Sequence, residues 1–485
     1  MPARQHVDKA TFLNSCICPT RGWFTRNLRH ATPPTEADLL RMEEGIEIGR
    51  RARLIFPGGV LVPWKKSEAA AEQTARLMAD RKVSAIFEAT FCVDGYIAKA
   101  DILLRAKRGW HLLEVKSSIN PSQDLIEDLA YTAMVAKRAG VKIVQASLLL
   151  LSGTYELGDP DADLFIEHDC TADVAEVITQ FESLWDSVAK TALAKKQPEP
   201  QLIFACRTCE YFSTRCLGKD AENHIFELPR LSQGAFDRLA QQLVTTISEI
   251  PADFKLTDPQ KRVRQAVTTG KPVIARKELA AFLDGIDWPA FYLDFETVKS
   301  SIPLYIGTTP HEQVVTQYSV HVCKKPGVVL DHRDFLADPS RDCRRELAER
   351  LLEDLEDCGA IVVYSSFEKT VLGNLGKLFR DLKPDLDGCI DRLFDLEKAF
   401  KNWFYHPEFR GRTSIKVTLP ALVDLSYDGL AIADGDTAVA KFARMARGEV
   451  TGHAAREVRQ ALLEYCKRDT LAMVRLHERL LKLCR

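Results

Sequence analysis

The order of apolar and polar positions predicts different elements in different parts of the chain. Residues 87–118, FEATFCVDGYIAKADILLRAKRGWHLLEVKSS, read as three strands, because turn signals at DG and KRG separate the apolar runs. Between about 220 and 285 the periodicity is helical. From 290 onward, strand-like runs such as 290–297 and 360–366 alternate with helical stretches and end in a long amphipathic helix.

This alternation of strands and helices predicts an α/β protein. At 485 residues the chain is too long for one ordinary core, so more than one domain is expected. We predict a first α/β domain over 1–220, a helical linker over 221–285 and a second α/β domain over 286–485.

Composition and charge narrow the setting. Apolar residues make up 46% and charged residues 28% of the chain, and no apolar run approaches the length of a membrane span. The first residues lack the apolar core of a signal peptide, so a soluble, cytoplasmic protein without a membrane partner is expected. The formal net charge of −2 means that any nucleic-acid surface is local, with basic runs at 50–53 and 261–277 as candidates.

A first group of candidate residues lies on two of the strands predicted within 87–118. Glu114 and Lys116 are two apart and so share one face of their strand, and a hairpin would bring Asp101 to the same place. Burying these charges unpaired would be costly. A divalent cation between Asp101 and Glu114, with Lys116 positioning a water molecule, would account for all three.

This pattern resembles the PD-(D/E)XK nuclease superfamily, and GYIAKADILL…GWHLLEVKSS resembles its RecB-like branch. The resemblance implies that Asp101 and Glu114 bind metal, that Lys116 is catalytic and that Glu88 is the upstream acidic ligand. The upstream helix lacks the histidine that is frequent in this family. Of the family's downstream Gln/Tyr motif, only Tyr131 is present.

A second feature is a cluster of cysteines among the thirteen in the chain. Cys206, Cys209 and Cys216 lie within eleven residues, and an odd number of scattered cysteines argues against a disulfide framework. Both zinc and iron–sulfur clusters accept this spacing. The fourth ligand is expected from CICPT near the start, as Cys18 or Cys16.

One cysteine before a nuclease core and three after it resemble the iron–sulfur-containing nucleases of the same superfamily. The resemblance implies a structural [4Fe–4S] cluster on Cys18, Cys206, Cys209 and Cys216, with Cys18 preferred because it precedes a proline. Zinc is the alternative metal and Cys16 the alternative ligand. A metal site joining Cys18 to Cys206 would close the long loop between them and so remove conformational freedom from the unfolded chain.

A third group combines an acid pair on a strand with residues on the C-terminal helix. Asp294 and Glu296 are two apart in AFYLDFET, and Tyr465 and Asp469 are four apart on one helix face. Acids from a strand and a helix can surround two cations, and a phenol can orient the attacking water.

This pattern resembles the DnaQ-like (DEDD) exonucleases of RNase H-like fold, in the subtype with tyrosine in the last motif. The resemblance implies that Asp294, Glu296 and Asp469 bind metal and that Tyr465 is catalytic. Further residues that it implies are Glu368 as a metal ligand where aspartate is usual, with Asp391 and Asp395 as alternatives, and Lys416 as a substrate-binding residue. The stretches FPGG, FEATF, YLDFET, FEKTVL, YHPEF and YCKRDTLAMVRL resemble bacterial proteins in which a RecB-like nuclease precedes domain of unknown function 2779.

Together these patterns predict a nuclease dependent on Mg²⁺ or Mn²⁺ that hydrolyses DNA at ends or on single strands, in repair, processing or defence. RNA is an alternative substrate. Two other interpretations remain: one centre is active while the other binds nucleic acid, or the whole protein is a non-catalytic scaffold with a structural metal. No G-x4-G-K-[ST] phosphate-binding loop occurs, so a helicase would be a separate partner.

Overall fold

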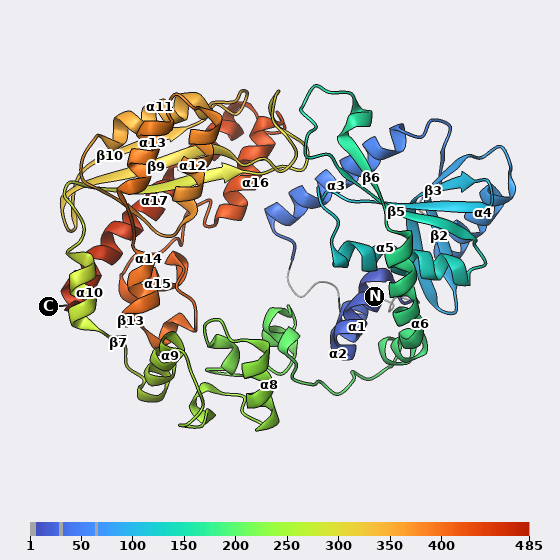
Figure 1. Ribbon diagram of the computed structural model, residues 1–485, viewed down its shortest axis with the longest axis horizontal. Helices are drawn as coiled ribbons and strands as arrows, with labels where there is room; N and C mark the ends of the chain where they lie inside the picture. Colours follow the sequence, from blue (N-terminus) through green and yellow to red (C-terminus); the bar gives the residue numbers. More distant parts are fainter. Residues whose placement is uncertain (1–5, 29–32, 64–65, 485) are drawn as a thin grey trace. The chain divides into compact units, whose positions relative to one another are not determined.

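The computed structural model describes residues 6–28, 33–63 and 66–484 and has an α/β architecture, as the sequence predicts (Figure 1). The chain forms two compact units. The first comprises residues up to 219 together with 300–312, and the second comprises 220–299 together with 313–485. The helical segment predicted as a linker at 221–285 is thus part of the second unit, because it packs with the elements that follow it.

The first unit contains a six-stranded mixed sheet whose strands lie in chain order. The strands β2, β3 and β4 form the antiparallel meander predicted over 87–118, and β5 then pairs parallel to β4. The strands are β1 (Val60–Leu61), β2 (Ala85–Val93), β3 (Tyr96–Ala106), β4 (Gly109–Val115), β5 (Ile143–Leu151) and β6 (Phe165–Asp169).

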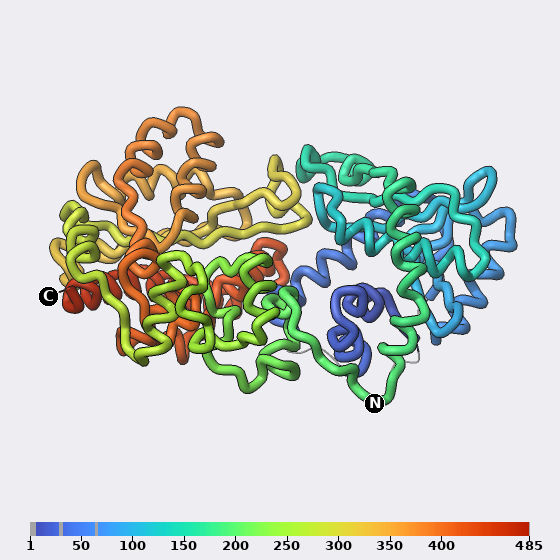
Figure 2. Tube along the Cα trace, turned by 60° about the horizontal axis from the view of Figure 1, so that its bottom comes forward, coloured from blue at the N-terminus to red at the C-terminus, as the bar shows by residue number. Residues whose placement is uncertain are grey.

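The helices of the first unit, except the last and shortest, contribute buried residues that pack against this sheet or one another. They are α1 (Lys9–Ile17), α2 (Pro19–Asn27), α3 (Glu36–Leu54), α4 (Ser67–Ala79), α5 (Gln123–Arg138), α6 (Thr171–Ala192) and α7 (Phe212–Arg215). Helix α1 lies against α5 and α6, and α2 lies against α6 (Figure 2). Phe12 of α1 contacts the rings of Tyr96, Tyr131 and Phe181, so α1 is anchored in the core of the unit.

The segment 300–312 joins two strands of the second unit but packs in the first. The buried Glu44 of α3 accepts hydrogen bonds from the Ser300 hydroxyl at 2.7 Å and from the Ser301 backbone N–H at 3.1 Å. His311 contacts the backbone oxygen of Ser117 through its ring Nε2. These contacts explain why this segment belongs to the first unit.

The second unit contains a five-stranded sheet in the order β10-β9-β8-β11-β12. Its first three strands in chain order are antiparallel neighbours, and β11 and β12 extend the sheet in parallel on the other side of β8. The strands are β8 (Ala290–Val298), β9 (Val314–Lys325), β10 (Val328–Leu336), β11 (Ala360–Val363) and β12 (Leu393–Asp395). The short β7 (Val273–Ile274) and β13 (Phe404–Tyr405) pair separately.

The long helix predicted at the C-terminal end of the chain covers β8 and β9. The helices of this unit are α8 (Gln233–Gln241), α9 (Asp258–Thr269), α10 (Arg276–Leu283), α11 (Arg344–Leu355), α12 (Phe367–Leu378), α13 (Lys383–Asp391), α14 (Glu397–Asn402), α15 (Ile415–Leu422), α16 (Gly435–Ala446) and α17 (Gly452–Cys484). Helix α9 ends before its C-cap residue Gly270, which has a left-handed φ of 63°. None of the described helices has the length and apolarity needed to cross a membrane.

Candidate metal centres

Three carboxylates gather on the sheet of the second unit. Asp294 and Glu296 lie on the same face of β8, and Asp469 comes close to them from α17. One oxygen of each lies within 4.8 Å of the others, the one such group of three or more acidic, histidine or cysteine ligands among the described residues. The acid pair identified on the strand and the acid identified on the helix therefore lie together in the structure.

Helix α17 holds this group together. The Cys466 thiol, buried next to Tyr465, lies 3.5 Å from Asp294 Oδ2. Farther along the helix, His477 accepts or donates a 2.7 Å hydrogen bond with the Tyr292 hydroxyl of β8. Residues of α17 thus contact the same face of β8 at two levels, which positions Asp469 opposite the acid pair.

The electrostatics of the group favour a bound cation. Burial and the neighbouring carboxylates Asp469, Glu296 and Glu368 raise the pKa of Asp294 well above its usual range. Burial and the Asp469 carboxylate raise the pKa of Glu296 to about 8. Burial raises the pKa of Asp469 to about 6, although Tyr427 and Lys416 oppose the shift. A divalent cation would offset both the burial and the repulsion that raise these pKa values.

The three carboxylates line a pocket with a volume of about 350 Å³, and a fourth acid, Glu368, lines it as well. Glu368 lies in the first turn of α12, and its Oε2 is buried without a hydrogen-bond partner. Burial and the nearby Asp395 raise the pKa of Glu368 to about 8. An unpartnered buried carboxylate oxygen beside the three-acid group is the chemistry expected of a metal ligand.

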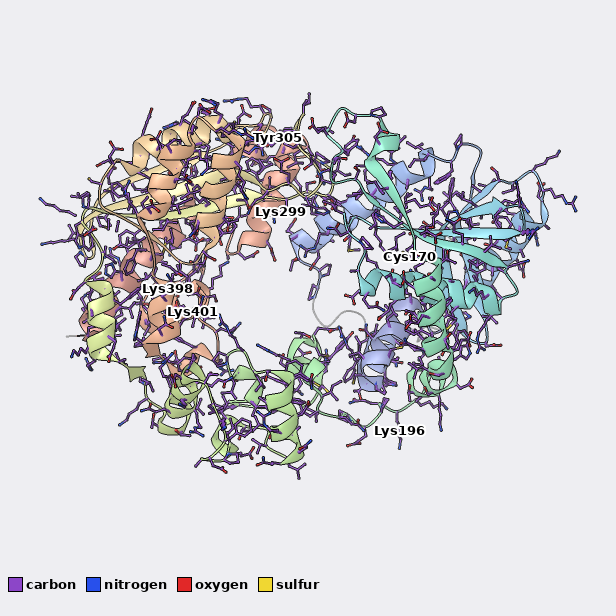
Figure 3. The ribbon with its side chains drawn as sticks, viewed as in Figure 1. Cys170, Lys196, Lys299, Tyr305, Lys398 and Lys401 are labelled. Atoms are coloured by element: carbon purple, nitrogen blue, oxygen red, sulfur yellow. The ribbon has the colours of Figure 1, made fainter. Side chains whose placement is uncertain are left out.

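Two further acids adjoin the pocket on α14 and the strand before it. Glu397 lines the pocket, while Asp395 ends β12 and accepts a hydrogen bond from the Glu397 backbone N–H at 3.0 Å. Lys398 and Lys401, labelled in Figure 3, extend from the same helix and lower the pKa of Asp395, although burial outweighs them and raises it. Asp391 is exposed at the end of α13 and is not among the residues lining the pocket.

Two tyrosines and one lysine lie close to the acids of this centre. Tyr465 and Lys416 both face the pocket, and Lys416 Nζ lies 5.2 Å from the Tyr465 ring centroid. The Tyr427 hydroxyl donates to Asp469 Oδ1, and the same ammonium lies 5.6 Å from the Tyr427 ring. Burial and the Asp469 carboxylate raise the pKa of Tyr465, so its phenol stays protonated. Sequence reasoning missed Tyr427, which lies in a loop outside any periodic element.

The first unit brings Asp101 and Glu114 to neighbouring positions. Ile102 pairs with Leu113, so the next pair in this antiparallel register is Asp101 and Glu114. Asp101 Oδ2 accepts a 2.8 Å hydrogen bond from the Val115 backbone N–H. Burial and the Glu114 carboxylate raise the pKa of Asp101 to about 7.

Two lysines and a further acid surround Glu114. Its Oε1 lies 3.1 Å from Lys116 Nζ and 2.5 Å from Lys9 Nζ, and Asp128 pairs with both ammoniums. Its Oε2 is buried and has no hydrogen-bond partner. Lys9 begins α1 and Asp128 lies on α5, and neither was identified from the sequence. The one local signal was that Asp128 shares a helix face with Tyr131.

Glu88 and Tyr131 have other partners. Glu88 lies across from Asp101 in the register of β2 and β3, has a left-handed φ of 56°, and pairs with Arg53 at 3.6 Å. The buried Tyr131 hydroxyl donates to the backbone oxygens of Val7 and Ile97, each at 2.9 Å. Tyr131 therefore ties the chain start to the sheet.

The four cysteines expected to bind a cluster line one cavity in the first unit, together with Phe24 and Tyr211. Burial and the nearby thiols Cys18, Cys209 and Cys216 raise the pKa of Cys206. In the described part of the chain, no three of these sulfurs lie within 4.8 Å of one another. The cavity therefore brings together the four thiols expected as ligands, and it accommodates the chemistry of zinc and of an iron–sulfur cluster alike.

Cys16 occupies a different environment from Cys18. Its side chain packs against the apolar core of the first unit, and burial raises its pKa to about 11. Cys18 is the C-cap of α1 and the N-cap of α2, at the turn that faces the cavity of the other three thiols. Cys16 therefore belongs to the apolar core, whereas Cys18, two positions later, faces the cavity where a metal would bind.

Comparisons with known proteins show similarities over part of the chain. The family described as domain of unknown function (DUF2779) matches residues 291–414. An uncharacterized protein of Mycoplasma genitalium, MG366, is 27% identical over 203 residues, covering 38% of this chain and 30% of the relative. Its Mycoplasma pneumoniae homologue is 26% identical over 207 residues, covering 38% of this chain and 31% of the relative. The chain thus spans less than a third of these curated relatives, and no solved structure matches it.

Proposed function

We propose that the protein is a metal-dependent nuclease whose principal centre lies in the second unit. The observation that supports this most directly is the convergence of Asp294, Glu296 and Asp469 within 4.8 Å of one another. Mutual repulsion among buried carboxylates is costly, and two-metal phosphodiesterases relieve it with bound cations. The fourth acid, Glu368, adds an unpartnered oxygen in the same pocket.

Asp294, Glu296, Glu368 and Asp469 would hold Mg²⁺ or Mn²⁺, whose oxygen preference matches this set. When bound, the cations would stabilise charge on a phosphodiester and activate water. Tyr465, kept protonated by burial and by its acidic neighbours, would orient that water through its hydroxyl. Lys416 would neutralise a substrate phosphate at the pocket wall.

The strand order supports the same proposal. An antiparallel three-stranded half joined to two parallel strands through β8 fits the RNase H-like fold implied by the DnaQ-like resemblance. In the first unit, the hairpin with Asp101 and Glu114 fits the PD-(D/E)XK resemblance. The Cys18, Cys206, Cys209 and Cys216 cavity is where a structural [4Fe–4S] cluster would bind.

DNA ends or single strands are the proposed substrate, because a pocket of about 350 Å³ suits one terminal nucleotide rather than a continuous duplex. The lysines on α14 and α15 would contact the backbone phosphates. RNA is the second candidate substrate, since the cations held by these acids would contact the phosphodiester, which DNA and RNA share, and not the sugar.

A cleavage assay tests the proposal. Single-stranded DNA, duplex DNA and RNA of one sequence, labelled at either end, are incubated with Mg²⁺ or Mn²⁺. The wild type is expected to release nucleotides, and Asp294→Asn and Asp469→Asn to lose at least a hundredfold in rate. Asp385→Asn, an exposed acid on α13, is the matched control. If wild-type protein cleaves none of these substrates, or if Asp294→Asn cleaves normally, the proposal is wrong.

A further inference from the structure

The first unit contains a charged group that the proposed function does not use. Lys9 Nζ lies 2.5 Å from Glu114 Oε1 and 3.2 Å from Asp128 Oδ2. Glu114 comes from β4, Asp128 from α5 and Lys9 from the start of α1. Three separate elements thus contribute to this charged group, and its Glu114 is the cross-strand neighbour of Asp101.

The two oxygens of Glu114 have different surroundings. Oε1 accepts a hydrogen bond from Lys9 Nζ and forms an ion pair with Lys116 Nζ at 3.1 Å. The Glu114 side chain is only 4% exposed, and its Oε2 is buried without a hydrogen-bond partner. A buried carboxylate oxygen without a partner is costly, so a ligand that supplies positive charge at Oε2 would be stabilised there.

Lys9 is fixed in place by the helix that it begins. Asp8 caps α1 by accepting a 2.9 Å hydrogen bond from the Thr11 backbone N–H, and Phe12 packs among three core rings. At the other end, Cys18 is the C-cap residue and faces the cysteine cavity. The ammonium is therefore delivered to Glu114 by a helix anchored along its length.

We propose that Lys9 is a tethered cation that competes with a divalent ion for Glu114. A divalent ion bound between Glu114 Oε2 and Asp101 would lie within a few ångströms of the Lys9 ammonium, and like charges at that distance repel strongly in a partly buried site. The ion binds when its attraction to the carboxylates outweighs this repulsion, and Lys9 then turns away toward Asp128 and solvent. The first centre is thereby loaded at a higher concentration of divalent ion than it would need without Lys9.

The first test measures Mn²⁺ binding by titration calorimetry on the full chain. Asp294→Asn and Asp469→Asn together remove the second centre, so the result does not depend on the proposed function of that centre. In this background Lys9→Met is expected to lower the Mn²⁺ dissociation constant on the order of tenfold. Lys9→Arg keeps the charge and is expected to leave it unchanged. Lys137→Met, an exposed lysine of α5, is the matched control, and Glu114→Gln should abolish the binding.

An unchanged or weaker affinity in Lys9→Met would overturn the proposal, because Lys9 would then be a structural partner of Glu114 and not a competitor. A second measurement covers the case in which that variant does not fold. Lysine acetylation of the same double variant, followed by mass spectrometry, is expected to modify Lys9 faster when Mn²⁺ is added, relative to Lys137. Equal or slower modification of Lys9 with Mn²⁺ would also overturn it.

Discussion

The Tyr427 hydroxyl donates a hydrogen bond to Oδ1 of Asp469, from a loop 42 positions earlier in the chain. This bond stabilises the charged form of Asp469 and so opposes the effect of burial on its pKa. Tyr465 lines the pocket, and the ring centroids of Tyr427 and Tyr465 are 6.1 Å apart. Tyr427, which lies outside the sequence motif, therefore favours the charged form of Asp469, the form that a cation would bind.

Replacing Tyr427 by phenylalanine is expected to raise the pKa of Asp469 above about 6, because the hydrogen bond that lowers it is lost. Divalent-ion affinity at pH 6 should fall severalfold while affinity at pH 8 changes little. Titration calorimetry with Mn²⁺ at both pH values measures this. Tyr318→Phe, which removes a hydroxyl bonded to Asp354 elsewhere in the sheet, is the control. Equal losses at both pH values would contradict the electrostatic explanation.

The stability of the metal-free protein is expected to fall as pH rises from about 5 to 8. The pKa of Glu296 is raised to about 8 by burial and Asp469, so the folded state binds more protons than the unfolded state over this range. Glu296→Gln should flatten the dependence and stabilise the metal-free protein at pH 8 by about 1–2 kcal/mol. Thermal unfolding at pH 5 and pH 8 measures it. Added Mg²⁺ should restore the wild type at pH 8 and have less effect on the variant.

The cysteine cavity predicts a sharp difference between two neighbouring thiols. Cys18→Ser should release the metal and lower the melting temperature by at least about 5 °C, because the site joins the chain start to Cys206 and its neighbours. Cys16→Ser, in the core, should retain the metal. Metal analysis and visible absorption of protein purified without oxygen measure this. Zinc in place of iron, or metal lost from Cys16→Ser and not from Cys18→Ser, would contradict the cluster assignment.

Glu88 is expected to contribute little to cation binding in the first unit, because it pairs with Arg53. Glu88→Gln should change Mn²⁺ affinity less than about threefold, whereas Glu114→Gln should abolish binding at this centre. Both are measured in the Asp294→Asn, Asp469→Asn background. A loss in Glu88→Gln as large as in Glu114→Gln would assign Glu88 as a ligand, as the RecB-like resemblance implies.

Much of the second centre could be predicted from local spacing. Residues two apart on β8 and four apart on α17 each share a face, so Asp294 with Glu296, and Tyr465 with Asp469, were identifiable as pairs. The strands β2 to β4 were likewise readable from their apolar runs and turn residues. Whether the pairs meet was not readable, because it depends on how α17 packs on the sheet.

The sequence by itself determined the α/β class, the main elements and which candidate residues share a face, because these follow from the periods of strand and helix. Tertiary structure alone decided that Lys9 and Asp128 enclose Glu114, that Tyr427 contacts Asp469, and that Cys18 rather than Cys16 faces the other thiols. It also assigned 300–312 to the first unit. These contacts join residues far apart in the chain, and packing of whole elements, which no local period encodes, brings them together.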